Sequence, residues 1–129
     1  MTATKANLVR LSARSLTPPS LLGVWTNELG STMDVTNVNG AYFSGVYAST
    51  DGHGGQVQGN LSGIAAGETL GWAVSWQPAS DSTTSWVGKF MVDNTTGRIC
   101  IYTLWYLSSG DASQPMWQSF TAGQDLFWQ

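Results

Sequence analysis

From Leu21 onward, the chain alternates between short runs in which apolar and polar residues take turns and clusters of turn-forming residues. A period of two residues is typical of β-strands that bury one face, and no segment keeps a helical period over three turns. Gly, Asn, Asp, Ser and Pro gather in seven breaks between the runs. The breaks predict eight strands, at about 22–28, 31–37, 41–49, 55–63, 69–77, 82–92, 98–108 and 117–128.

Short strands in regular succession, with connections of hairpin size, predict an all-β fold. An antiparallel up-and-down barrel and a two-sheet sandwich both fit this pattern. Of the two, an eight-stranded barrel leaves no free sheet edge and has an interior wide enough to hold one small ligand.

The first twenty residues differ in composition from the remainder. They contain no acidic and no aromatic residue, and they end with Pro18, Pro19 and Ser20. Their basic residues are spaced among Ser and Thr as in a transit peptide, and the continuous apolar stretch of a secretory signal is missing. We expect a flexible N-terminal extension over 1–20 and a single folded domain over 21–129.

Composition excludes several classes of partner. Only 10% of the 129 residues are charged and the net charge is −3, so the chain lacks the basic patch that nucleic-acid binding needs. No apolar run approaches the roughly 18 residues of a membrane helix, and we expect no membrane partner. Cys100 is the only cysteine, which excludes an internal disulfide and a cysteine metal cluster.

The predicted strands share an unusual inner face, on which large aromatic residues alternate with small polar ones toward the same end. The sets that share a face are Trp25, Asn27, Leu29 and Ser31; Phe43, Gly45, Tyr47 and Ser49; Leu70, Trp72, Val74 and Trp76; Ser82, Thr84 and Trp86; and Ile101, Thr103, Trp105 and Leu107. Apolar walls with a few convergent polar groups are typical of small-molecule sites. A ligand cup and a plain Trp-rich core both remain open on this pattern.

Five segments carry a resemblance to a known family. The runs "GVWTNELGST", "SGVYAST", "LGWAVSW", "STTSWVGKF" and "TLWYLSSG" followed by "MWQSFTAGQDLF" resemble the avidin and streptavidin family of biotin-binding proteins, in order and spacing, over Leu21 to Phe127. The resemblance implies an eight-stranded antiparallel up-and-down β-barrel that binds biotin with high affinity and without catalysis.

Matching positions imply how the polar part of biotin would be held. Asn27, Ser31 and Tyr47 match the donors to the ureido oxygen, and Ser49 and Asp125 match the acceptors of the ureido N–H groups. A carboxylate acceptor makes the stronger, charge-assisted hydrogen bond. The resemblance thereby accounts for an amide and a hydroxyl on the inner face of the first strand.

The resemblance also assigns the apolar part of the site and its rim. Thr84 matches a contact to the ring sulfur, and Ser82 matches a contact to the tail carboxylate. Trp117 matches a lid that is lent to a neighbouring subunit, which implies a homo-oligomer, with a tetramer favoured. His53, in a Gly-rich loop that departs from the family pattern, is a possible loop contact. The residues that match the walls are Trp76, Trp86, Trp105 and Leu107.

Three alternatives to biotin binding can be drawn from the same residues. A lipocalin-like barrel for another apolar ligand would not need the convergent polar groups, and a lectin-like sandwich would expose its Trp residues. An enzyme with Asp125 and His53 as an acid–base pair lacks a nucleophile motif and a metal-ligand cluster. We expect no enzyme activity, no metal and no cofactor apart from biotin as the ligand. The resemblance favours an extracellular location.

Overall fold

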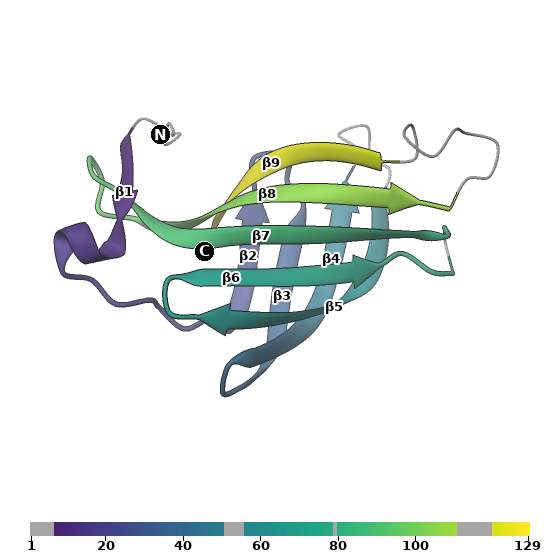
Figure 1. Cartoon of the computed structure of the whole chain (residues 1–129), viewed down its shortest axis with the longest axis horizontal. Coiled ribbons are helices and arrows are strands. Elements are labelled where there is room, and N and C mark those ends of the chain that lie inside the picture. Colours follow the sequence, from purple (N-terminus) through teal and green to yellow (C-terminus); the bar gives the residue numbers. More distant parts are fainter. Residues whose placement is uncertain (1–6, 51–55, 79, 111–119) are drawn as a thin grey trace.

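A computed structural model of the chain describes residues 7–50, 56–78, 80–110 and 120–129, and most of them lie in strands (Figure 1). Eight consecutive strands form a closed antiparallel barrel, because each strand pairs with the next and the last, β9, also pairs with the first, β2. The predicted up-and-down barrel is therefore confirmed. The barrel strands are β2 Gly23–Asn27, β3 Thr32–Asn39, β4 Tyr42–Thr50, β5 Gln56–Ala66, β6 Thr69–Ser75, β7 Ser82–Asp93, β8 Ile99–Ser109 and β9 Phe120–Trp128.

The observed strands follow the predicted ones within about three residues wherever the structure describes the chain. Strand β5 is longer than predicted because its pairing with β6 continues to Ala66 opposite Thr69. Only two residues then form the hairpin loop, and Gly67 takes the positive φ of +62° that such a loop requires.

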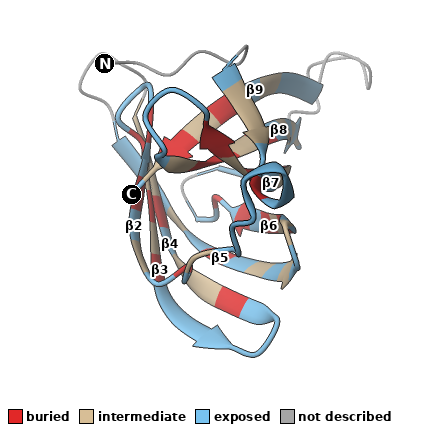
Figure 2. Ribbon diagram, turned by 90° about the vertical axis from the view of Figure 1, so that its left-hand side faces the viewer, coloured by how far each residue is buried: buried red, intermediate tan, exposed pale blue. Residues whose placement is uncertain are grey.

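Aromatic side chains fill the middle of the barrel. The rings of Trp72 and Trp86 stack at 5.5 Å with an interplanar angle of 14°, and Tyr47 lies 4.6 Å from Trp86. Phe127 meets the edges of Tyr47 and Trp72. Figure 2 shows buried segments on several of the barrel strands. Burial of this apolar surface, at about 25 cal/mol per Å², is the main source of the stability of the fold. Other residues form one end of the barrel.

The N-terminal segment differs from the predicted flexible extension from residue 7 onward. Strand β1, Leu8–Arg10, pairs with the end of β7, and the short 3₁₀ helix η2, Leu11–Arg14, follows it. Leu11 is fully buried in the barrel core, and the backbone N–H of Ser12 donates to Glu68 Oε1 at 2.9 Å. The composition of the segment did not predict this packing, because its few apolar side chains are spaced among polar residues.

Cys100 is covered although its neighbours on the same face are not. It lies with Leu104 and Tyr106 on the outer face of β8. Leu104 and Tyr106 are exposed, but Cys100 is fully buried, between Met91 and Trp128 on the neighbouring strands. Burial, followed by the nearby charge of Asp93, raises the pKa of the thiol to about 12, so it stays protonated at physiological pH.

Among the residues that the structure describes, no helix is both long and apolar enough to cross a membrane.

Candidate functional site

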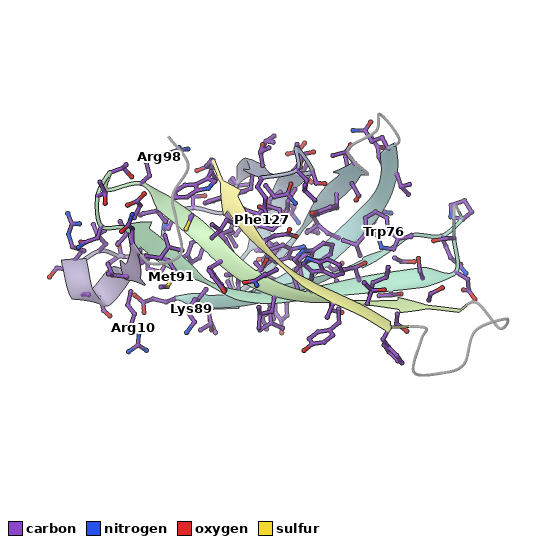
Figure 3. The ribbon with its side chains drawn as sticks, turned by 90° about the horizontal axis from the view of Figure 1, so that it is seen from above. Arg10, Trp76, Lys89, Met91, Arg98 and Phe127 are labelled. Carbon is purple, nitrogen blue, oxygen red and sulfur yellow. The ribbon has the colours of Figure 1, made fainter. Side chains whose placement is uncertain are left out.

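A cavity of about 280 Å³ lies within the end of the barrel that is remote from η2. Trp76 marks this end in Figure 3. The structure places eleven of the predicted contact residues around this single space. They are Asn27, Ser31, Tyr47, Ser49, Trp76, Ser82, Thr84, Trp86, Trp105, Leu107 and Asp125.

Asn27 is held by the turn that follows β2. Its Oδ1 accepts the backbone N–H groups of Leu29 at 3.0 Å and Ser31 at 2.9 Å. Because the carbonyl half of the amide is used in this turn, the NH₂ half is left as a donor, and it makes a side-chain hydrogen bond to Asp125. The turn thus explains locally why an amide sits on an inner face: its carbonyl folds the chain and its NH₂ faces the cavity.

Ser31 and Tyr47 form a second pair of polar groups. Ser31 Oγ accepts the backbone N–H of Thr50 at 3.1 Å and is hydrogen-bonded to the phenol of Tyr47. Burial, with a smaller contribution from the negative charge of Asp125, raises the pKa of Tyr47 above its ordinary value. The phenol therefore stays protonated and able to donate at physiological pH.

Asp125 is the buried carboxyl group of the cavity and is only 8% exposed. Its Oδ2 accepts the indole N–H of Trp86 at 3.1 Å, and its backbone oxygen accepts the hydroxyl of Thr103 at 3.1 Å. Burial raises the pKa of Asp125, and the hydrogen bond from Trp86 acts in the opposite direction. Oδ1 takes no part in the bond to Trp86, so Asp125 keeps capacity to accept a hydrogen bond from a ligand.

Indole rings form the apolar walls of the cavity. The Nε1 of Trp76 donates to Thr84 Oγ1 at 2.8 Å, and the ring meets Tyr47 edge-on at 5.9 Å. Trp105 lies over Gly123, where a Cβ would come within 2.4 Å of the indole Cζ2. The glycine therefore makes room for this wall. The indole N–H groups of Trp76 and Trp86 are both satisfied, so their rings present apolar surface.

Four further residues line the cavity that the sequence did not single out as contacts. Leu29 shares the predicted inner face with Trp25 and Asn27, yet it is 63% exposed, because it sits in the tight turn completed by Gly30 at φ +87°. Ser80 reaches Ser82, their hydroxyl oxygens being 2.6 Å apart. Thr50 and Val57 are the other two. Leu29, Thr50 and Ser80 lie in or beside predicted turns, whereas Val57 lies within the strand predicted over 55–63.

Two predicted contacts, His53 and Trp117, lie outside the described residues. Their roles remain predictions.

Comparison with known proteins decides the family. The family model described as "Avidin family" matches residues 15–129. This chain belongs to the avidin family. Chicken (Gallus gallus) avidin-related protein 4/5 is 36% identical over 126 residues, covering 91% of this chain and 80% of the relative. Chicken avidin is 33% identical over 130 residues with the same coverage. A solved structure of a biotin-binding protein from chicken superposes with a TM-score of 0.72 at 31% identity, covering 85% of this chain and 95% of that one.

Proposed function

We propose that the cavity binds biotin tightly and without catalysis. The observation that carries this proposal is the convergence of an amide, two hydroxyl groups and a carboxyl group at a cavity whose other walls are indole rings. They belong to Asn27, Ser31, Tyr47 and Asp125. Membership of the avidin family and the likeness to a chicken biotin-binding protein support biotin as the ligand.

The polar groups suit a cyclic urea. Asn27, Ser31 and Tyr47 would donate to its oxygen, while Ser49 and Asp125 would accept its two N–H groups. Donors at the oxygen polarise the urea and make its N–H groups better donors in turn. Since the groups are already held by the turn after β2 and by Trp86, little reorganisation opposes binding.

The remaining lining suits the rest of the molecule. The rings of Trp76, Trp86 and Trp105, with Leu107, would cover the bicyclic ring and the aliphatic tail. Each Å² of apolar surface buried in this way would contribute about 25 cal/mol to the free energy of binding. Thr84 would face the ring sulfur. The hydroxyl pair of Ser80 and Ser82 would face the carboxylate of the tail, and His53 is a further proposed contact there.

We also propose a homo-oligomer, with a tetramer favoured. Val87, Leu104 and Tyr106 on the outer faces of β7 and β8 are 69%, 50% and 62% exposed, and exposed apolar groups that gather on one face are typical of an interface. Trp117 would be lent to the cavity of a neighbour. Light scattering after size exclusion tests the assembly, and a monomer mass would refute it.

Family resemblance also supports an extracellular location and a binding domain over 21–129.

Tryptophan fluorescence tests the ligand class, because the indoles of Trp76, Trp86 and Trp105 line the cavity. Biotin is expected to change the emission and to saturate at one equivalent per chain, whereas lauric acid, an apolar chain without a urea, is expected to leave it unchanged. The reverse result would support the lipocalin-like apolar carrier and refute biotin binding.

A further inference from the structure

A second cavity, of about 290 Å³, adjoins the candidate site at the rim of the barrel. It lies between the connection from β6 to β7 and the end of β8, which Figure 1 shows at the same end of the barrel. Ser82 lines both cavities. A ligand tail that reaches Ser82 from the first cavity is therefore at the border of the second.

The lining of the second cavity is polar. Thr83 pairs with Ser75 on β6 and with Ser108 on β8, so three residues with hydroxyl groups form one row across neighbouring strands. Gln77 and Asp81 add an amide and a carboxylate. None of the described residues that line this cavity is cationic or carries a large apolar side chain. The cavity therefore suits a hydrogen-bonding or positively charged group.

Asp81 carries the charge of this lining and is held in place from two sides. Its Oδ1 accepts the side-chain N–H of Gln77 at 2.9 Å, and its backbone oxygen accepts the N–H of Gly110 at 2.7 Å. A Cβ at Gly110 would clash with Oδ2, so the glycine leaves room for the carboxylate. Since Gln77 uses only Oδ1, Asp81 keeps capacity to accept a hydrogen bond from a ligand.

Asp81 also lies close to the proposed position of the biotin tail. Ser80 and Ser82, its neighbours in sequence, line the first cavity, and their hydroxyl groups are the proposed contacts of the tail carboxylate. Adjacent Cα atoms are about 3.8 Å apart, so a free carboxylate held there would lie near the charge of Asp81. Like charges repel at this range, whereas an amide carries no charge and an attached ammonium group would be attracted.

We propose that the second cavity is a subsite for a positively charged group joined to the tail of biotin through an amide, and that Asp81 determines the specificity of this subsite. The inference rests on the proposed function, because it needs the bicyclic ring of biotin in the first cavity. The favoured ligand is then an amide of biotin that carries an amine, in preference to the free acid. Asp81 binds the ammonium group, and the row of hydroxyl groups at Thr83 offers it further acceptors.

Equilibrium competition among three probes tests the subsite on the full-length protein. The probes are biotin, its N-(2-aminoethyl) amide, which carries an ammonium group, and the uncharged N-(2-hydroxyethyl) amide of the same length. At about 0.01 M salt we expect the wild type to bind the aminoethyl amide about three- to fivefold more tightly than the hydroxyethyl amide, as for an ion pair in contact with solvent. At about 1 M salt, where the screening length is about 3 Å, the two amides are expected to bind equally.

A matched pair of substitutions assigns the preference to one carboxylate. Asp81→Asn removes the charge, and its amide oxygen can still accept from Gln77. We expect this variant to bind the two amides equally at low salt and free biotin up to about fivefold more tightly than the wild type does. Asp34→Asn makes the same change on β3, outside both cavities, and is expected to keep the wild-type preference.

Two results would overturn the subsite alone: tight binding of all three probes with no preference in the wild type at low salt, or a preference that Asp81→Asn retains. The salt dependence of the wild type decides the matter even if Asp81→Asn fails to fold. If none of the three probes binds, the proposed function fails, and the subsite fails with it.

Discussion

The indole Nε1 of Trp86 donates to Asp125 Oδ2 at 3.1 Å, so one wall of the cavity also orients its carboxyl group. The two residues are 39 positions apart and lie on β7 and β9, which are separated by β8 in the barrel. This hydrogen bond connects the apolar wall of the site to its carboxyl group, so a substitution of either residue is expected to change the position of the other.

Removal of the carboxyl group tests its place in the site. Asp125→Ala is expected to weaken biotin binding by more than about 1.5 kcal/mol, because a charge-assisted hydrogen bond in a dry site is lost and the indole N–H of Trp86 loses its acceptor. The ratio of the association and dissociation rates of biotin, measured for wild type and variant, would give the loss. Asp34→Ala, an acid on β3 away from the cavity lining, serves as the control. A smaller loss for Asp125→Ala would remove this residue from the ligand shell.

Gly123 is expected to be necessary for the shape of the cavity. A Cβ at this position would meet the indole of Trp105 at 2.4 to 2.9 Å, so Gly123→Ala must displace the ring. We expect affinity for biotin to fall by about tenfold or more, since a displaced wall loses both burial and shape. Faster release of fluorescent biotin would be the readout. Unchanged release with an unchanged melting temperature would show that Trp105 is not held there.

Trp117 tests the proposed exchange between subunits. Trp117→Lys is expected to loosen the assembly and to speed biotin release together, because one side chain would serve both the interface and the neighbouring cavity. Size exclusion and an off-rate measurement on the same sample are the readouts. An unchanged elution volume together with an unchanged off-rate would show that Trp117 belongs to neither.

Stability measurements test the packing of the N-terminal segment. Leu11 is fully buried, so Leu11→Ala is expected to lower the free energy of unfolding by about 2–5 kcal/mol. Leu22→Ala is the matched control, because Leu22 is 50% exposed and should change stability by about 0.5 kcal/mol or less. Equal, small effects in urea unfolding would mean that the segment does not contribute to the fold.

Much of this structure could be predicted because its local signals agree. The two-residue alternation and the turn clusters placed the strands, and a short loop such as the one at Gly67 leaves an antiparallel hairpin as the simplest connection. Eleven of the described cavity residues could be predicted because they repeat one pattern on successive strands, and because family resemblance assigned each of these positions.

The features that could not be predicted depend on contacts between segments that are remote in sequence. Leu11 lies in a stretch of polar composition, and only the pairing of β1 with β7 shows that it is buried. Cys100 has the alternation of an outer face, yet it is covered in the folded chain. Glu28 reaches β9 across 98 positions. No local pattern marks such a contact, because it exists only once the barrel has closed.

Isothermal titration of the purified protein with biotin tests the central claim most directly. The account predicts one site per chain, a favourable enthalpy from the polar contacts and binding too tight for the curve to resolve. The absence of heat, combined with unchanged tryptophan fluorescence, would contradict it, because the cavity would then serve a ligand other than biotin.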